Sequence, residues 1–370
     1  MMHLGTAVSL VVSAAMWRLQ ILSYAQLHHR GLFDPAIWDD GLGGEFSQNM
    51  EPQVRIGIDL GGTKIEVIAL DDSATSTEAA LLRHRVPTPV GDYAGILNTV
   101  AELVAFTERE TGQTGTVGIA TPGAISPSTT LLKNSNSTVL NNKPVDRDLE
   151  ARLRRRIRIE NDANCFALSE AVDGAAANAR VVFGVILGTG VGAGVVVERQ
   201  IHSGRNKIAG EWGHNPLPWP RGDELPGTEC YCGKRGCIET FLSGAGVSRE
   251  YRARSGHQRT AAAIAAAAAG DPVANECLDL YQDRLARSLA SIINVLDPDA
   301  IVLGGGLSNL TRLYPALPAL LKSYTFSADT GTPIVRAVHG DSSGVRGAAW
   351  LWPIGGSCTT RLTSRSSHRT

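Results

Sequence analysis

The chain has 370 residues, of which 43% are hydrophobic and 19% are charged, and its formal net charge is -1. This composition suits a soluble globular protein with a large core, and the near-neutral charge gives no reason to expect nucleic acid or an anionic membrane as a partner. No apolar stretch reaches the roughly 20 residues that a membrane-spanning helix needs. We therefore expect a cytoplasmic protein of roughly two domains.

The two ends of the chain differ in composition from the rest. We predict that residues 1–52 form an N-terminal extension outside the fold, and one hypothesis derives residues 1–49 from an upstream start codon. The apolar run "LGTAVSLVVSAAM" (4–16) imitates the core of a signal peptide, but only His3 stands where a basic region belongs. Residues 355–370 are rich in Gly, Ser and Thr, and we expect them to be disordered.

The first predicted element is a hairpin over residues 55–71, "RIGIDLGGTKIEVIALD", in which two apolar strands flank a Gly-Gly-Thr-Lys turn. A similar segment, "GVILGTGVGAGVVVE", occupies residues 184–198. The strands of both hairpins are dense in Val, Ile and Leu, as expected of strands that are covered on both faces. The repeat indicates that the chain contains two similar halves.

Strands and helices alternate along the rest of the chain. We predict strands over 116–123, 156–162 and 300–306, and helices over 163–179, 260–270, 283–297 and 342–352. Alternation of this kind is typical of an α/β fold. Together with the repeat it predicts a two-lobed clamp, with lobes at 53–163 and 164–340 and a helix at about 341–353 that packs back on the first lobe.

The glycine turns are candidate phosphate-binding sites. Backbone N–H groups of such turns approach phosphate oxygens closely, and Thr63 and Lys64 add a hydroxyl donor and a positive charge. Asp59 would repel phosphate directly, so its position predicts Mg²⁺ between them. The alternative is that each turn is an ordinary hairpin turn, because neither matches the Walker pattern. The predicted ATP-binding residues are Asp59, Gly61, Gly62, Thr63, Lys64, Gly188, Thr189, Gly190, Gly304, Gly305 and Gly306.

The cysteines are unevenly spaced. Three of the six crowd together and combine with a histidine as H-x15-C-x-C-x4-C, at His214, Cys230, Cys232 and Cys237. One imidazole and three thiolates complete a tetrahedral structural zinc site with no open position. The alternative is a set of reduced thiols without a ligand, since a disulfide within Cys-x-Cys would be strained.

Asp162 stands at the junction between a predicted strand and a predicted helix. The pattern by itself favours a helix N-cap, which is the commonest use of Asp before a helix. The second possibility is a catalytic carboxylate.

Several segments, taken in order, resemble the ROK family of bacterial sugar kinases and repressors: "IGIDLGGTK", "GTGVGAG", "GEWGH", "CYCGKRGCIET" and "IVLGGG". The resemblance covers about residues 54–353. Other segments, such as "KNSNSTVLN", "ENDANCFALSEAVDGAA" and "HGDSSGVRGAAWLWP", are similar to the fructokinases of that family. The resemblance implies an actin/hexokinase-like fold of duplicated, ribonuclease H-like lobes, which agrees with the repeat.

The resemblance also implies roles for individual residues. It makes Asp162 the general base, places zinc on the four clustered ligands, and defines residues 211–240 as a zinc-binding sugar loop. The implied sugar-binding residues are Gly123, Asn136, Asn161, Glu211, His214 and Glu239. The alternative for Glu211 and Glu239 is that they are only surface acids. His214 has two ring nitrogens, so either Nδ1 or Nε2 is available for zinc while the other meets sugar.

The function that the resemblance implies is an ATP- and Mg²⁺-dependent fructokinase that phosphorylates the 6-hydroxyl of D-fructose, with mannose and glucose as further substrates. The family is usually homodimeric. The alternatives are a glucokinase of the same family, a ROK-type repressor that binds sugar but not ATP, and a non-catalytic sugar-binding module. The intact glycine turn and the roughly 50 residues before the first hairpin favour the enzyme over the repressor, and "END" favours it over the binding module.

Overall fold

The computed structural model describes residues 54–71, 80–327, 329–340 and 343–353, all of which belong to one compact unit, Met50–Thr370. The predicted N-terminal extension and C-terminal tail lie outside the described residues. Within those ranges, no helix combines the length and the hydropathy that a membrane span requires.

Two five-stranded sheets repeat one strand order. In each sheet the first two strands form an antiparallel hairpin, and a later strand lies parallel to the first. The first sheet runs in the order β3 (Leu82–Pro87), β2 (Lys64–Asp71), β1 (Val54–Leu60), β4 (Gly115–Thr121) and β7 (Arg158–Asn161). The second sheet runs in the order β10 (Gln200–Ile201), β9 (Val191–Val197), β8 (Val181–Leu187), β11 (Ala300–Gly304) and β12 (Ile334–Arg336). This duplicated topology confirms the predicted α/β, actin/hexokinase-like fold class.

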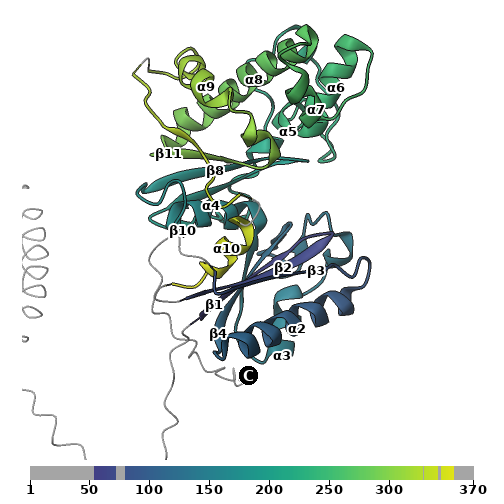
Figure 1. Cartoon of the computed structure of the whole chain (residues 1–370), viewed down its shortest axis with the longest axis vertical. Helices are drawn as coiled ribbons and strands as arrows, with labels where there is room; N and C mark the ends of the chain where they lie inside the picture. Colours follow the sequence, from purple (N-terminus) through teal and green to yellow (C-terminus); the bar gives the residue numbers. More distant parts are fainter. Residues whose placement is uncertain (1–53, 72–79, 328, 341–342, 354–370) are drawn as a thin grey trace, which may run out of the picture. The chain divides into compact units, whose positions relative to one another are not determined.

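Helices cover the outer face of each sheet. On the first sheet, α2 (Tyr93–Thr111) packs against β1, β2 and β3 and also contacts α3 (Val145–Leu153). On the second sheet, the apolar sides of β8 and β9 join one large core with the following helices (Figure 1): α5 (Ile238–Leu242), α6 (Gly244–Ser255), α7 (Ala261–Ala267), α8 (Pro272–Leu296) and α9 (Leu313–Leu321).

Helix α8 begins earlier than predicted. Its N-cap is Asp271, whose side chain accepts hydrogen bonds from Val273 N and Ala274 N, and Pro272 fills the first helical position. Pro is favoured there because its missing N–H would have no partner in the helix. The remaining short elements are β5 (Ala124–Ile125), β6 (Leu132–Lys133), η2 (Thr138–Leu140), η3 (Glu211–His214), η4 (Gly222–Glu224) and η5 (Gly306–Asn309).

Two helices lie between the sheets (Figure 1). Helix α4 (Asp162–Val172) packs on β8 and β9, helix α10 (Ser343–Ala349) packs on β1 and β4, and the two helices contact each other. Their backbones meet at Gly347, where an added Cβ would lie 1.7 Å from the carbonyl oxygen of Cys165. Only glycine permits this approach, so the sequence fixes the distance between α4 and α10.

A buried polar cluster ties the end of α4 to α10. Asp173 accepts hydrogen bonds from His339 Nε2 at 3.1 Å, Arg346 Nε at 2.6 Å and Trp350 Nε1 at 3.1 Å. Burial opposes the charge on Asp173, but the hydrogen bonds from His339 and Arg346 outweigh it and hold the pKa of the carboxyl below its usual value. The helix that starts at Asp162 is therefore anchored at its far end. The predicted lobe boundary at residues 163–164 stays a prediction.

Candidate active site and metal centre

The turn between β1 and β2 presents Asp59 on the face of the first sheet that α10 covers. An added Cβ on Gly344, at the start of α10, would lie 3.4 Å from Asp59 Oδ2. Thr88 holds the turn, because its Oγ1 donates to Gly61 O at 2.7 Å and its N donates to Thr63 O at 3.0 Å. The exposed residues of this turn are Gly62, Thr63 and Lys64.

The other two glycine clusters lie side by side in the second sheet. Strand β11 runs parallel to β8 and pairs Gly304 with Ile186, so the ends of the two strands meet at one edge. Gly305 has a φ of 79°, and an added Cβ there would lie 2.5 Å from Leu187 O. This contact brings the Gly304–Gly306 segment close to the turn Gly188–Gly190, which follows Leu187.

Asp162 occupies the first turn of α4 and is not its N-cap. The cap is Asn161, whose Oδ1 accepts hydrogen bonds from Ala163 N at 2.9 Å and Asn164 N at 3.3 Å. The capping role that the bare sequence pattern favoured for Asp162 is therefore wrong, because the neighbouring amide takes it. Asn161 also donates from Nδ2 to Gly123 O at 3.2 Å, which joins two of the predicted sugar-binding residues.

Four carboxylates interact in pairs near this helix start, namely Asp59, Glu66, Asp162 and Glu211. Desolvation, with a further contribution from the charge of Glu211, raises the pKa of Asp162 to about 6. Desolvation, followed by the charges of Asp162 and Glu66, raises the pKa of Asp59 to about 7, although Lys64 opposes the shift. Acids from β1 and β2, from the start of α4 and from η3 thus belong to one electrostatic site. A divalent cation beside Asp59 would relieve this repulsion, so the residues present fit Mg²⁺.

Glu239 reaches the turn of the second sheet. It lies in α5, and its Oε2 accepts a hydrogen bond from Val191 N at 2.9 Å. Glu211 opens η3 and is exposed. Asn136 is exposed in a loop, and among the described residues no hydrogen bond links its side chain to the other predicted site residues. The loop itself packs against Gly123, since an added Cβ on Gly123 would lie 2.9 Å from the N of Ser135, the residue before Asn136.

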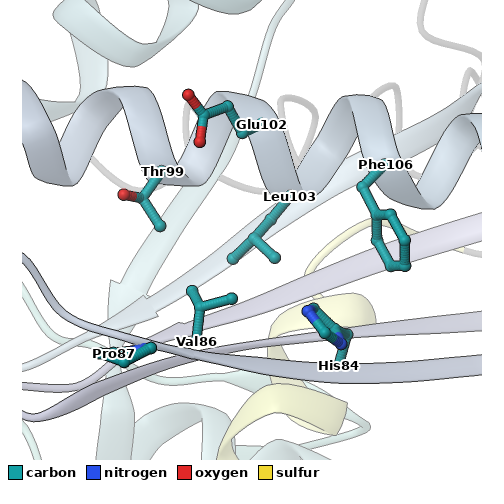
Figure 2. Close-up of a pocket in the computed structure, with 7 residues that line it drawn as sticks. All are labelled: His84, Val86, Pro87, Thr99, Glu102, Leu103 and Phe106. Atoms are coloured by element: carbon teal, nitrogen blue, oxygen red, sulfur yellow. The ribbon is translucent and has the colours of Figure 1, made fainter.

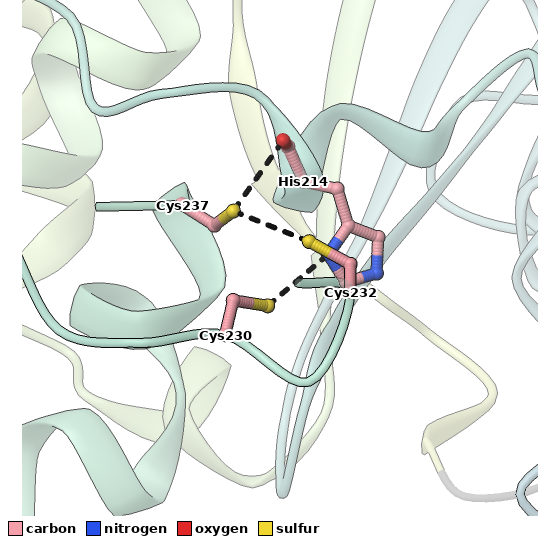
Figure 3. A group of neighbouring side chains, drawn as sticks. All are labelled: His214, Cys230, Cys232 and Cys237. Carbon is pink, nitrogen blue, oxygen red and sulfur yellow. Dashed lines mark hydrogen bonds between the residues drawn. The ribbon is translucent and has the colours of Figure 1, made fainter. Parts of the chain in front are cut away.

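The four predicted metal ligands form a compact cluster, drawn in Figure 3, with all ligand atoms within 4.8 Å of one another. Cys232 Sγ lies 3.6 Å from Cys237 Sγ, and Cys230 Sγ lies 3.5 Å from His214 Nδ1. A tetrahedral zinc ion with Zn–S bonds of ~2.3 Å has S···S edges of about 3.8 Å, whereas a disulfide would need about 2.05 Å. The donor set and its spacing therefore fit a structural zinc ion.

The orientation of His214 separates its two nitrogens. Nδ1 faces the thiols, and Nε2 lies 2.9 Å from the hydroxyl of Tyr231. The side chain of Tyr231 is 84% exposed and stands at right angles to the imidazole ring. Of the two assignments that the sequence left open, this geometry supports Nδ1 toward the metal, while Nε2 meets the hydroxyl of Tyr231.

Three residues near the site had no assigned role in the sequence analysis. Thr88 supports the first glycine turn, and Tyr231 contacts His214. Glu160 accepts hydrogen bonds from Asn161 N at 3.0 Å and from Ser203 Oγ at 2.6 Å. The only available signal for Glu160 was its place at the start of "END", and Tyr231 had none beyond its position between two cysteines.

A separate cavity of about 330 Å³ lies between β3 and α2 (Figure 2). Its lining consists of His84, Val86, Pro87, Thr99, Glu102, Leu103 and Phe106, and it includes none of the predicted site residues. His84 pairs across the sheet with Val67, which belongs to the core under α2, whereas Asp59 faces α10. The cavity and the candidate site therefore lie on opposite faces of the first sheet.

Comparison with known proteins gives consistent matches over the described fold. The sequence model of the ROK family matches residues 55–354. An N-acetyl-D-glucosamine kinase of Haemophilus influenzae is 42% identical over 302 residues, which span 80% of this chain and 98% of that protein.

Solved structures agree in fold. The ROK hexokinase of Thermus thermophilus has a TM-score of 0.72 and 30% sequence identity, covering 80% of this chain and 97% of that one. A ROK family glucokinase from Streptomyces griseus, solved in complex with glucose and AMPPNP, has a TM-score of 0.64 and 26% identity, covering 80% of this chain and 98% of that one.

Proposed function

The chain belongs to the ROK family, and from that premise we propose that it is an ATP-dependent kinase that phosphorylates the 6-hydroxyl of a hexose, with N-acetyl-D-glucosamine as the first candidate. The observation that carries the proposal is the position of Asp162. It begins the helix between the two sheets, its neighbour Asn161 takes the capping role, and its carboxyl group is poised with a pKa of about 6. A general base needs such a pKa, close to but below the working pH.

We propose that the carboxylate of Asp162 accepts the proton of the sugar hydroxyl that attacks the phosphate. Phosphoryl transfer passes through a loose transition state, so a base contributes less than positioning and charge neutralisation do. Asn161, Glu211 and Glu239 then orient the other sugar hydroxyls. Their positions support this role, because Asn161 caps the same helix and the charge of Glu211 acts on Asp162.

The glycine turns are assigned to the phosphates of ATP. The exposed N–H groups of the first turn, the Thr63 hydroxyl and the Lys64 ammonium would contact phosphate oxygens. Asp59 would hold Mg²⁺ through waters, and the ion would supply neutralisation of the developing charge. Burial and the charges of Asp162 and Glu66 raise the pKa of Asp59 to about 7, and a cation bound beside this carboxylate would offset those effects.

Zinc has a structural role in this proposal. All four coordination positions would be filled by protein atoms, so no position would remain for substrate. Its effect on catalysis would be indirect. By fixing His214 and Cys237 it would fix Glu211 and Glu239, which flank them in the sequence.

The choice of sugar rests on relatives and is tested separately. N-acetyl-D-glucosamine is supported by relatives at about 40% identity over nearly their whole length, including those of Haemophilus influenzae and Vibrio vulnificus. D-fructose remains the second candidate because "KNSNSTVLN" and similar segments resemble ROK fructokinases. Glucose and mannose are further candidates within the same pocket chemistry.

A coupled ADP-release assay over these four sugars tests the proposal. We expect ADP release that requires both sugar and Mg²⁺, with the highest kcat/KM for N-acetyl-D-glucosamine. A higher value for fructose would contradict the substrate assignment and support the fructokinase prediction. No sugar-dependent ADP release by a folded, zinc-loaded protein would contradict the kinase assignment itself.

A further inference from the structure

We infer that Glu239 is a positioning residue that couples the sugar site to the nucleotide turn Gly188–Gly190, so that each substrate strengthens the binding of the other. The inference rests on the proposed kinase function and adds a regulatory property to its active site. It starts from a contact that the sugar-binding role of Glu239 does not require.

Glu239 binds the nucleotide turn directly. Its Oε2 accepts a hydrogen bond at 2.9 Å from the backbone N of Val191, the residue that follows the turn. An added Cβ on Gly190 would lie 2.7 Å from the same oxygen, so the carboxylate packs against the turn itself. A carboxylate that accepts from a backbone N–H makes a charge-assisted bond, which is stronger than a neutral one.

The start of the next helix, α6 (Gly244–Ser255), holds the turn at a second point. Helix α5 ends at Leu242, and shortly afterwards Gly244 N donates to Gly188 O at 2.8 Å. The Gly188–Gly190 turn is thus bound at one end by the backbone of Gly244 and at the other by the side chain of Glu239. Helices α5 and α6 meet at Ser243, so a shift of α5 would act on both contacts.

The other end of α5 belongs to the metal-bound loop. Its N-cap is Cys237, a predicted zinc ligand, and the next residue, Ile238, donates its N–H to Asn215 O at 2.9 Å. Asn215 directly follows His214, another predicted ligand. Glu239 therefore lies between the loop that carries the predicted zinc ligands and the nucleotide turn. A displacement of the loop at Cys237 would reach the turn through Glu239, two residues further along the chain.

One oxygen of Glu239 is left for the sugar. Within the described part of the chain Oε2 bonds Val191, while Oε1 makes no hydrogen bond, and the side chain is only partly buried. A sugar hydroxyl that donates to Oε1 would fix the rotamer of Glu239. Less conformational entropy would then be lost when the nucleotide orders the turn. Thermodynamic linkage requires that the nucleotide favour sugar binding by the same factor.

Glu211 provides the matched control. It is the second predicted sugar-binding acid, it flanks the same metal cluster, and its charge acts on Asp162. Among the described hydrogen bonds, none joins its carboxylate to the Gly188–Gly190 turn. Removing the charge of Glu211 should weaken sugar binding without uncoupling the two substrates.

The test is isothermal titration of the full chain with AMPPNP and Mg²⁺, with and without the sugar that proves most active. We expect sugar to tighten AMPPNP binding by a factor of about 5–150, the usual range for coupled sites. In Glu239→Ala the factor should fall to near 1, in Glu239→Gln it should be intermediate, and in Glu211→Gln it should stay at the wild-type value.

Zinc content and melting temperature identify variants in which the loop is lost. If Glu239→Ala loses zinc, Gly190→Ala serves instead, because its new Cβ would displace Glu239 Oε2 from the turn while the carboxylate itself is retained. AMPPNP titration without sugar measures any direct effect of this variant on the nucleotide turn, and the coupling factor should fall to near 1. Coupling unchanged in a zinc-loaded Glu239→Ala or Gly190→Ala protein, or absent from an active wild-type enzyme, would overturn the inference. A wild-type protein that binds no nucleotide and forms no phosphosugar would instead contradict the kinase assignment.

Discussion

At the scale of single residues, the proposed chemistry depends on the different roles of two adjacent polar side chains, Asn161 and Asp162. Asn161 caps α4 by accepting hydrogen bonds from the N–H groups of Ala163 and Asn164, so the carboxylate of Asp162 is not needed as the cap. Desolvation keeps its pKa near 6 rather than near 4. A carboxylate with this pKa is mostly deprotonated at neutral pH but still has appreciable proton affinity, as the proposed role of general base requires.

Asp162→Asn should lower kcat by about 10²–10⁴-fold, because a general base contributes that much, while the KM for sugar changes little. The amide oxygen of Asn can still accept the hydrogen bond that Ala163 N gives Asp162 at 2.8 Å, so the helix start should persist. Steady-state kinetics and sugar titration measure the two quantities. Retention of wild-type kcat would contradict the assignment of the base.

The rate should depend on pH through the same carboxyl group. Because the base acts only when deprotonated, kcat/KM should fall about tenfold per pH unit below about 6, the raised pKa of Asp162. Asp59 and Glu211 are the acids that act on this group, and Glu211→Gln should move the acidic limb to lower pH. An acidic limb near pH 4 in the wild-type enzyme would show that burial does not shift this group.

At the scale of elements, the proposed site consists of glycine turns on both sheets and a loop that carries the four proposed zinc ligands. The conformation of each turn depends mainly on its flanking strands, because hydrogen bonds across each hairpin fix the ends of the turn. The loop 214–237 has few buried apolar side chains of its own. Its cross-links are the four proposed metal ligands and the buried ion pairs from Glu224 to Arg284 and Arg287 in α8. Substitutions in the turns should therefore change the KM for ATP, whereas substitutions of the proposed metal ligands should change the zinc content and the KM for sugar.

Cys232→Ser should release zinc and raise the KM for sugar, since serine is a poor zinc ligand and Cys232 is an exposed corner of the cluster. Metal analysis together with sugar kinetics measures both effects. Cys277→Ala is the control, because Cys277 lies in α8 outside the cluster. Full activity of Cys232→Ser without bound metal would contradict the structural role of zinc.

Gly61→Val should raise the KM for ATP by more than it raises the KM for sugar. An added Cβ at this position would lie 2.8 Å from Lys64 O, so a side chain distorts the turn. Gly270→Val is the matched control, because an added Cβ there meets nothing within 4 Å. Initial rates over ATP and sugar concentrations separate the two constants, and an unchanged KM for ATP would mean that this turn does not bind phosphate.

The duplicated hairpins and the metal cluster were predictable from the sequence. Apolar strands around glycine turns have a strong pattern, and the spacing of one histidine and three cysteines allows few geometries. Strand β3 and helix α2 were not predicted. In β3, "LRHRVP", the buried alternation is weak because it lies at the edge of its sheet.

Other features depend on side-chain placement that one sequence does not encode locally. Asn161 and Asp162 are both good capping residues, so their division of roles follows from where β7 ends. The contact between Tyr231 and His214 depends on a rotamer, and the bond from Val191 to Glu239 joins residues far apart in the chain. Substrate choice is harder still, because it depends on the shape of a pocket that several of these placements create together.

At the scale of the whole molecule, two sheets of one topology meet through α4 and α10. Helix α4 carries Asp162 at its start and is tied to α10 at its end through Asp173. Any relative movement of the sheets would therefore pass through the helix that holds the proposed base. This arrangement suits an enzyme that assembles its site from both halves of the chain.

The most direct test of this account is phosphorus NMR of the full-length protein incubated with Mg²⁺-ATP and N-acetyl-D-glucosamine. The account predicts a new phosphomonoester signal, coupled to the C6 protons of the sugar, that grows as ADP appears and is absent with Asp162→Asn. A folded, nucleotide-binding protein that yields no sugar phosphate from any of the four candidate sugars would contradict it.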